Sequence, residues 1–442
     1  MSAVPEGRIV APALPLLAQA APDRVFAWSQ GRAITLGEFL ADVHAAAAVL
    51  PPGDAINLCE DRYAFLVAFC AVACRGHANL LPASRAPQAV AETLAAYPGS
   101  HAVIDADLPT PGTHGRRDEV PLIPAAQIVV IGFTSGSTGK PKPNAKRWAS
   151  FAASNARNVT AFEALIDFAA TPLAHVVATV PPQHMYGIEL SVLLPLLGPF
   201  SVHASRPLFP ADVAAALAAV PAPRVLVTTP VHLAALLRED VELPALAAIT
   251  SATAPLSQEL AVRAERRYGA PALELFGSTE TCVIAQRRCA LGEDWRLHEG
   301  VSLRPQPDGT LVDAPWFEQA IALADLVELL PGQRFRLCGR HADLVEIAGK
   351  RASLGDLTHR IVALPGVEDA VAFQLDEADA AGVRRIAALV VAPTRSELDL
   401  LQELRASIDA AFLPRPLRKV AALPRNETGK LPRAALLAAL RD

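Results

Sequence analysis

Apolar residues along the chain alternate between short β-rich runs and longer stretches rich in Ala and Leu. Thr35 and Glu38 have the spacing of a capping box, and apolar residues follow at helical intervals, which predicts a helix beginning after Thr35. The apolar run at 63–74 predicts a buried helix. The predicted strands of this region are 55–59, 128–133, 176–180, 225–228, 246–250 and 273–276. This alternation is typical of an α/β fold, in which ligands gather at the carboxyl ends of the strands.

The last hundred residues have a different pattern, which predicts a separate small α+β domain. The predicted elements are strands at 367–373 and 386–391 and helices at 396–412 and 434–440. We place the domain boundary at residue 341, so that 1–341 forms the large domain and 342–442 the small one.

Composition narrows the classes of protein. The 442 residues are 52% apolar and 19% charged, which indicates a globular chain of two or three domains. A net charge of −5, no basic run and only 5% aromatic residues argue against nucleic acid as a partner. The run at 63–74 is too short to span a membrane. The six cysteines form no CxxC pair, which favours reduced thiols and a cytoplasmic protein.

A loop at 134–142 follows a predicted strand directly and is rich in groups that bind phosphate. Within nine residues it has four hydroxyl side chains, two glycines and two lysines. Glycines let backbone N–H groups turn toward an anion, and hydroxyls and lysines add donors. A P-loop ATPase is disfavoured, because Pro141 and Thr134 stand where that motif needs Ser or Thr and Gly. The candidate phosphate contacts are Thr134, Ser135, Gly136, Ser137, Thr138, Gly139 and Lys142.

This loop resembles the signature loop of the acyl-adenylate-forming enzymes, which include acyl- and aryl-CoA synthetases, peptide-synthetase adenylation domains and firefly luciferase. The resemblance implies that the loop holds the β- and γ-phosphates of ATP and that Thr138 assists the departure of pyrophosphate. It also implies a large N-terminal α/β domain with layered sheets and a small mobile C-terminal α+β domain. Three further family motifs follow in the family's order, at 276–280, 339–351 and 424–433.

The motif at 276–280 is similar to the family's aromatic-Gly-x-Thr-Glu sequence. By resemblance, Phe276 flanks the adenine, Gly277 and Ser278 line the nucleotide, and Thr279 contacts the α-phosphate. Glu280 supplies an oxygen for Mg²⁺, a cation that prefers carboxylate ligands. Taken alone, the same residues would read as a surface turn with a solvated charge.

The later motifs add the ribose contacts, the hinge and a lysine. Arg340 resembles the family's ribose-binding arginine, and Asp325, fifteen residues earlier, stands where the family has a carboxylate that accepts hydrogen bonds from both ribose hydroxyls. Ala342 falls where many relatives have a charged hinge residue, so Ala342 and Asp343 are the hinge candidates. Lys430 resembles the adenylation lysine, whose cation bridges the substrate carboxylate and the α-phosphate.

The acid-binding pocket is predicted from two weaker matches. Residues 181–187 stand where the family has a gating His or aromatic residue, so His184 is either a gate and catalytic contact or a packed loop histidine. Residues 251–256 resemble a segment that forms one pocket wall and reaches the adenine through Thr253. The pocket candidates are His184, Gly187, Ser251, Ala252 and Phe276.

Together these motifs imply an AMP-forming acid–thiol ligase that uses ATP and Mg²⁺ and passes the acyl group to the pantetheine thiol of CoA or of an acyl carrier protein. Small pocket residues favour a small aromatic acid such as 3- or 4-hydroxybenzoate. The chain also resembles the stand-alone aryl-acid ligases of aryl-polyene pigment pathways, xanthomonadin among them. A short- or medium-chain fatty acyl-CoA synthetase and a catalytically idle adenylate-binding protein are the alternatives.

Overall fold

The computed structural model of the chain describes residues 13–18, 21–82, 85–135, 141–340, 344–347, 350–378, 384–426, 429 and 431–441. The chain divides into two compact units, Met1–Gly292 and Glu293–Asp442. Each unit has its own secondary structure and is described by itself.

The larger of two layered sheets in unit 1 is mostly parallel. The strands that unit 1 contributes to it are, in order, β15 (Cys282–Arg288), β14 (Ala272–Ser278), β13 (Ala248–Ser251), β12 (Arg224–Thr228), β10 (Ala174–Ala178), β11 (Phe200–His203), β2 (Val25–Ser29) and β3 (Arg32–Thr35). The strands from β14 to β2 run parallel, and β15 and β3 are antiparallel to their neighbours. The carboxyl ends of the parallel strands therefore lie along one edge, which carries the 251–256 and 276–280 segments.

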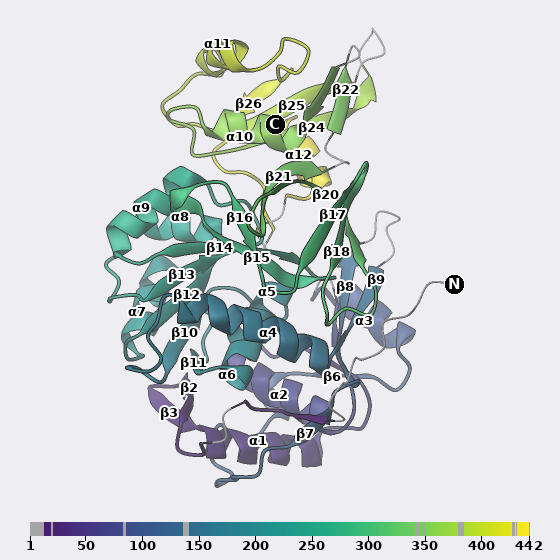
Figure 1. Ribbon diagram of the computed structural model, residues 1–442, viewed down its shortest axis with the longest axis vertical. Helices are drawn as coiled ribbons and strands as arrows, with labels where there is room; N and C mark the ends of the chain where they lie inside the picture. The colour runs from purple at the N-terminus through teal and green to yellow at the C-terminus, as the bar shows by residue number, and fades with distance from the viewer. Residues whose placement is uncertain are drawn as a thin grey trace. The chain divides into compact units, whose positions relative to one another are not determined.

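Helices cover both faces of this sheet because side chains alternate along each strand. On one face Val177, Leu226 and Ile249 belong to a buried cluster with α7 (Pro210–Ala218), α8 (Pro230–Arg238) and α9 (Gln258–Tyr268), which line up beside the sheet in Figure 1. Val176 and Val225 point the other way, into the main core. That core holds α4 (Trp148–Glu163), α5 (Met185–Ile188), the π-helical turn η2 (Glu189–Leu193) and α6 (Leu194–Leu197).

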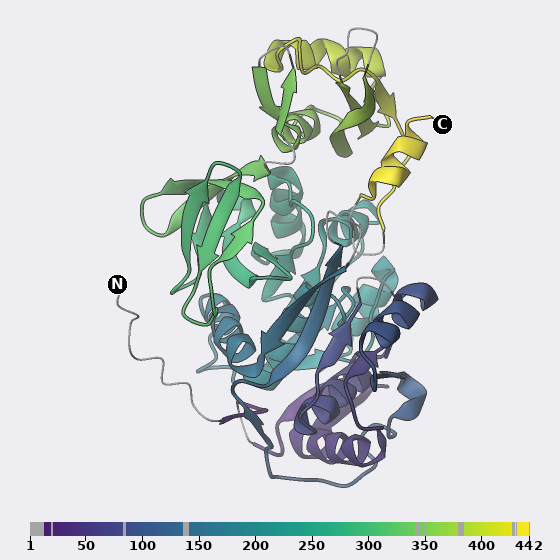
Figure 2. The ribbon, with the colours of Figure 1, turned by 90° about the vertical axis from the view of Figure 1, so that its right-hand side faces the viewer.

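The second sheet of unit 1 ends in a long hairpin. Its order is β6 (His101–Val103), β4 (Ala55–Asn57), β5 (Asn79–Leu81), β8 (Ile128–Ser135) and β9 (Pro141–Arg147). All neighbours are parallel except β8 and β9, the two long arrows near the centre of Figure 2. The remaining elements of the unit are β1 (Ala13–Pro15), β7 (Leu122–Pro124), α1 (Leu36–Val49), α2 (Arg62–Cys74), α3 (Pro87–Ala96), η1 (Asp105–Asp107) and η3 (Cys289–Leu291).

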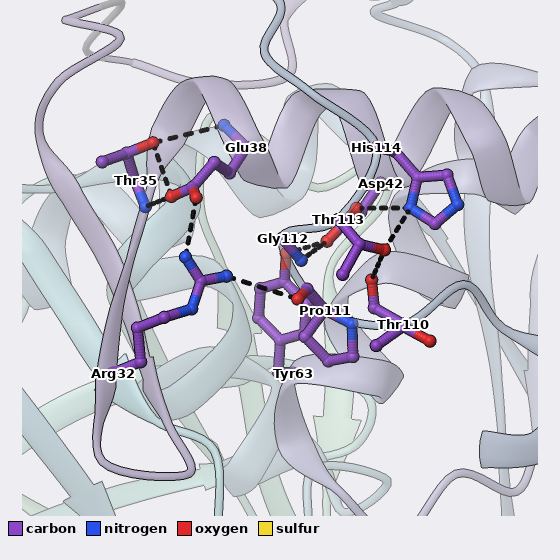
Figure 3. Close-up of polar contacts among 10 residues, drawn as sticks. All are labelled: Arg32, Thr35, Glu38, Asp42, Tyr63, Thr110, Pro111, Gly112, Thr113 and His114. Carbon is purple, nitrogen blue, oxygen red and sulfur yellow. Dashed lines mark hydrogen bonds and ion pairs between the residues drawn. The ribbon is translucent and has the colours of Figure 1, made fainter.

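The predicted start of α1 is confirmed. Thr35 Oγ1 accepts the N–H of Glu38 at 3.3 Å, and Glu38 Oε2 accepts the N–H of Thr35 at 2.7 Å, which completes a capping box (Figure 3). Arg32 adds an ion pair to Glu38 at 2.8 Å. Local hydrogen bonds therefore fix the point where β3 becomes α1.

A buried carboxylate on α1 ties the 110–114 segment to the core. Asp42 is fully buried and accepts hydrogen bonds from the Tyr63 hydroxyl and the Gly112 N–H, both at 2.6 Å (Figure 3). His114 Nδ1 lies 3.1 Å from the same carboxylate. Burial, followed by the Asp42 charge, raises the pKa of the Tyr63 hydroxyl, so Tyr63 stays a donor. This network anchors a long connection that has little regular structure.

Unit 2 begins with two groups of antiparallel strands. One has β20 (Asp325–Leu330), β21 (Arg334–Arg340) and β16 (Trp295–Leu297), and the other has β17 (Ser302–Gln306), β18 (Gly309–Asp313) and β19 (Ile321–Leu323). The later elements are β22 (Leu344–Ile347), β23 (Lys350–Ser353), α10 (Leu354–Val362), β24 (Asp369–Ala378), β25 (Arg384–Val391), α11 (Glu397–Ser407), β26 (Leu417–Lys419) and α12 (Arg433–Ala439).

The C-terminal elements have hydrophobic cores of their own. One buried cluster runs from Val345 to Leu417, and a second joins Phe373 and Leu389 to Leu436 of α12. The predicted strands and the last helix are present, but α11 ends at Ser407, earlier than predicted, because Ile408 adopts an extended conformation. Separate cores support the proposal that a small domain begins near residue 342, although that boundary stays a prediction.

Candidate active site

The β8–β9 hairpin brings the two ends of the phosphate loop together. Thr134 pairs with Lys142 and Ser135 with Pro141 in the strand register. The predicted contacts Gly136, Ser137, Thr138 and Gly139 lie outside the described residues, as do the side chains of Thr134 and Ser135. Lys142 is exposed. The hairpin register therefore fixes where the loop starts and ends.

The strand that leads into this loop lies against two other predicted motifs. A Cβ added at Gly132 would stand 3.0 Å from Thr279 Cγ2 and 3.5 Å from Met185 Cε. Met185 directly follows His184, the gate candidate. The structure thus brings together three segments that are far apart in the sequence: the strand before the phosphate loop, the Thr279 turn and the His184 loop.

The turn that carries Thr279 and Glu280 is tightly wound. Ser278 and Thr281 bond reciprocally, each hydroxyl accepting the other's backbone N–H at 3.1 Å. Gly277 packs so closely on the backbone that a Cβ there would meet Cys282 O at 2.1 Å. Cys282 itself has a φ of +61°, a conformation that L residues rarely adopt. Strained and crowded backbone of this kind is concentrated at functional sites.

Two buried charged residues that sequence reasoning missed hold this turn. Lys146 of β9 donates from Nζ to the carbonyl oxygen of Glu280. Glu189 of η2 accepts the N–H of Val283 at 3.0 Å. The only sequence signal for Glu189 was a single charge in the apolar run that follows Gly187.

His184 is the N-cap residue of α5. Its Nδ1 accepts the N–H of Tyr186 at 3.3 Å at the start of α5, and the ring is half-buried. Gly187 packs against the same loop, since a Cβ there would lie 2.0 Å from Pro181 O. The Tyr186 hydroxyl lies 3.0 Å from Thr250 Oγ1 at the end of β13. The gating role of His184 stays a prediction.

The end of β13 and the turn after it carry two hydroxyls that no described protein group satisfies. Ser251 Oγ and Thr253 Oγ1 are buried without a hydrogen-bond partner among the described residues. Thr253 also has a φ of +77°. Ala252 is buried beside them. Buried hydroxyls usually find a partner, so this pair fits a segment that donates to a bound ligand, as predicted for the acid and adenine contacts.

The two ribose candidates are neighbours in unit 2. Asp325 pairs directly with Arg340 in the antiparallel register of β20 and β21, which explains their fifteen-residue spacing. Thr310 Oγ1 donates to the Asp325 carbonyl at 2.6 Å, and Asp325 is half-buried. The side chain of Arg340 and the hinge candidates Ala342 and Asp343 lie outside the described residues.

The chain on either side of Lys430 is held by arginine. Lys430 itself lies outside the described residues. Arg425 forms a two-pronged ion pair with Asp369, with contacts of 2.9–3.1 Å, and donates to the carbonyl of Gly429 at 2.9 Å. Arg433, on the other side, bonds Asp376 and the Gln374 carbonyl. These contacts anchor the segment that carries the predicted adenylation lysine.

The described residues offer too few ligands to hold a divalent cation without the phosphates of a bound nucleotide. Across the part of the chain that the structure describes, no three acidic, His or Cys side chains gather as a metal site. Glu280 offers one half-buried carboxylate. Mg²⁺ is commonly held by one or two carboxylates together with substrate phosphates, so the single Glu280 carboxylate suits it once ATP supplies the phosphates.

Comparison with known proteins places this arrangement in a family. A family model for the AMP-binding enzyme matches residues 57–314. A 4-coumarate–CoA ligase from Rhodobacter capsulatus is 31% identical over 304 residues, which cover 67% of this chain and 73% of that protein. One from Halorhodospira halophila is 31% identical over 319 residues, with the same coverage. The ATP-bound RpMatB–BxBclM chimera B3 has a similar fold, with a TM-score of 0.78 at 19% identity, covering 95% of this chain and 96% of that one.

The predicted fold, a large α/β domain followed by a smaller one, is confirmed by this structural match. Within the described residues no helix is long and apolar enough to cross a bilayer. The expected enzyme class, an AMP-forming acid–thiol ligase, is also confirmed. The chain therefore belongs to the AMP-binding enzyme family.

Proposed function

We propose that this enzyme adenylates a small aromatic carboxylic acid, such as 3- or 4-hydroxybenzoate, and transfers the acyl group to a pantetheine thiol of CoA or an acyl carrier protein. The observation that carries the proposal is the approach of Gly132, Thr279 and Met185, which joins the predicted phosphate, α-phosphate and acid-binding segments. A carboxylate and an α-phosphate have to meet at such a point for adenylation to occur.

Each predicted residue has a defined part in the proposed first step. Phe276 and Thr253 bind the adenine side of ATP, while Asp325 and Arg340 bind the ribose. The 134–142 loop binds the β- and γ-phosphates, and Thr279 donates to the α-phosphate. A carboxylate oxygen attacks the α-phosphorus, the bond to the β-phosphate oxygen breaks, and pyrophosphate leaves with the electron pair. Lys430 offsets the repulsion between the α-phosphate and the attacking carboxylate. Bound through Glu280, Mg²⁺ would screen charge on the phosphate oxygens.

The proposed second step needs no protein nucleophile. The pantetheine thiol releases its proton to solvent and its sulfur attacks the acyl carbon of the mixed anhydride. The carbon–oxygen bond to AMP breaks, and AMP leaves with the electron pair. Ala342 and Asp343 are the proposed hinge between the two steps. The proposal includes residence in the cytoplasm, where the six free cysteines of this chain would stay reduced.

The aromatic acid is supported by the pocket residues and by the relatives. Ser251 and Ala252 are buried, and Gly187 packs on the backbone of Pro181, which favours a short pocket over a long acyl tunnel. The two relatives with 31% identity are named for an aromatic acid, 4-coumarate. The orphan Ser251 hydroxyl adds a polar group that can bond a ring substituent.

Acid-dependent ATP–pyrophosphate exchange tests the proposal. The panel contains benzoate, 3- and 4-hydroxybenzoate, cinnamates and fatty acids of four to twelve carbons. Exchange with one aromatic acid supports it, and exchange with fatty acids alone replaces it with a fatty acyl-CoA synthetase. A folded protein that binds ATP but exchanges with no acid would contradict it and indicate an idle adenylate-binding protein. CoA and carrier protein are then compared as acceptors with the active acid.

A further inference from the structure

Glu189 is a fully buried carboxylate that connects three elements of unit 1. It lies in the π-helical turn η2, directly after α5. Its oxygens accept hydrogen bonds from Val283 N at 3.0 Å, from Ser154 Oγ at 3.2 Å and from Asn158 Nδ2 at 3.2 Å. Ser154 and Asn158 belong to α4, and Val283 follows the Thr279–Glu280 turn in β15. Single π-helical turns within a longer helix, as here between α5 and α6, are often found at functional sites.

Lys146 holds the beginning of the same turn. Its side chain is 7% exposed, and its Nζ donates to the backbone carbonyl of Glu280. Glu280 and Val283 are three residues apart, so one buried cation binds the start of this stretch and one buried carboxylate binds its end. Between them lies Cys282, with its left-handed backbone conformation.

A role in packing alone does not account for the buried charges of Glu189 and Lys146. Burial raises the pKa of Glu189 to about 7, and hydrogen bonds from Val283, Asn158 and Ser154 and the charge of Lys146 only partly oppose that shift. The ionised carboxylate is therefore costly to the fold at neutral pH. A neutral side chain of the same shape would fill the same space without this desolvation cost. Costly buried polar groups of this kind often serve a functional site.

We propose that Glu189 and Lys146 are positioning residues for adenylation, which together hold the Thr279–Glu280 turn in the geometry that receives the α-phosphate and Mg²⁺ of bound ATP. This inference rests on the proposed function, since it assigns Thr279 and Glu280 to the nucleotide. Neither residue touches the reacting atoms; both act through the backbone of the turn. The groups that face Glu189 are Lys146 on β9, the Cys282 thiol on β15, and Ser154 and Asn158 on α4.

ATP binding tests the roles of Glu189 and Lys146 separately from catalysis. It is measured by calorimetry on the full-length protein, once with Mg²⁺ and once with EDTA. The variants are Glu189→Gln, Lys146→Met and Lys146→Arg. We expect Mg²⁺ to strengthen ATP binding to the wild type, and expect Glu189→Gln and Lys146→Met to lose at least tenfold of that strengthening. Lys146→Arg keeps a donor and is expected to restore part of it. The melting temperature of Glu189→Gln at pH 8 is expected to be no lower than that of the wild type.

Glu265→Gln is the matched control. Glu265 accepts the N–H of Ala272 at 2.9 Å and pairs with Arg288 at 2.8 Å, so this variant also removes a carboxylate that bonds backbone, but away from the turn. It is expected to keep the Mg²⁺ effect. The proposal is overturned if Glu189→Gln and Lys146→Met both keep the wild-type Mg²⁺ effect. It is also overturned if every variant that loses the effect has a lowered melting temperature, since the loss would then reflect a weakened fold.

Pyrophosphate exchange then separates this inference from the proposed function. A wild type that binds ATP with a Mg²⁺ effect but exchanges with no acid refutes the adenylation proposal, while the binding data still decide the role of Glu189. With an active acid, Glu189→Gln is expected to lower kcat of exchange at least tenfold. In Glu189→Gln the strengthening of ATP binding by Mg²⁺ is expected to be constant from pH 6 to 8. In the Glu265→Gln control, which keeps Glu189, this strengthening is expected to weaken below about pH 7 as Glu189 takes up a proton.

Discussion

Gly277 is the position where a single methyl group should damage the site most. In the structure a Cβ at Gly277 would lie 2.1 Å from Cys282 O, 2.7 Å from Cys282 C and 2.8 Å from Val283 Cα. All three atoms are backbone, so no side-chain rotation relieves the clash. Gly277→Ala therefore requires a backbone shift in the stretch that carries Thr279 and Glu280.

The size of the effect follows from these distances. The closest contact is 0.9 Å inside the 3.0 Å that real Cβ atoms respect, so the strands have to separate by nearly that amount. Overpacking of this kind typically costs about 1–3 kcal/mol of stability. Misplacing a reacting group by about 1 Å can cost ~100-fold in rate. Gly277 is exposed, so the shift displaces few buried contacts and the free energy of unfolding should fall only within this range. ATP binding and pyrophosphate exchange should fall more, because both depend on the position of Thr279 and Glu280.

Exchange activity and urea unfolding, measured on the same preparations, check this prediction. Gly269→Ala is the control, because Gly269 has a φ of +66° with no atom within 4 Å of its added Cβ. It should lose about 1 kcal/mol through backbone strain and keep its exchange rate. Wild-type exchange in Gly277→Ala would refute the assignment of this turn to the nucleotide.

Three further predictions concern other parts of the chain. Lys430→Ala should bind ATP as the wild type does but lose pyrophosphate exchange by at least ~100-fold, and equal exchange would exclude Lys430 as the adenylation lysine. Arg425→Met removes the bonds to Asp369 and Gly429 and should lower exchange at least tenfold with ATP binding kept; unchanged exchange would show that this clamp does not position Lys430. Asp42→Asn should lower the free energy of unfolding by about 2–4 kcal/mol in urea, and a loss below 1 kcal/mol would mean the buried network is dispensable.

The fold was predictable where local chemistry decides it. Thr35 and Glu38 form the predicted capping box, and the predicted strands of the large sheet are present with shifts of a few residues at their ends. The strand at 246–250 begins instead at Ala248, and the helix at 396–412 ends at Ser407. The order of the strands was not predictable, because pairing depends on contacts between distant segments.

Site residues were predictable only where a motif marks them. Asp325 and Arg340 were paired by spacing, and the register of β20 and β21 accounts for that spacing. Glu189 and Lys146 belong to no motif, and their role depends on backbone groups that lie 94 and 134 residues further along the chain. A sequence gives the type of a side chain, but the backbone N–H or C=O that it bonds is a property of the folded chain.

The pH dependence of stability offers a last check on Glu189. Its pKa is raised from 4.5 to about 7 by burial, so the folded state binds a proton more tightly than the unfolded state does. The contribution of Glu189 to wild-type stability should therefore fall as pH rises from about 4.5 to 7 and then level off. In Glu189→Gln this fall is absent. Relative to the wild type, the free energy of unfolding of the variant should rise by about 2.5 kcal/mol between pH 5 and 8, at about 1.4 kcal/mol per pKa unit.

Urea unfolding of both proteins at pH 5, 6, 7 and 8 measures this difference, and Glu265→Gln again serves as the control. Burial raises the pKa of Glu265, but hydrogen bonds from Arg288 and Ala272 outweigh it, and the net shift is downward. Glu265 therefore stabilises the folded state above its unfolded pKa, and its variant should differ from the wild type by a constant amount between pH 6 and 8. If Glu189→Gln also differed from the wild type by a constant amount between pH 5 and 8, the buried carboxylate would not be held at a cost. The argument that it serves the nucleotide-binding turn would then lose its energetic basis.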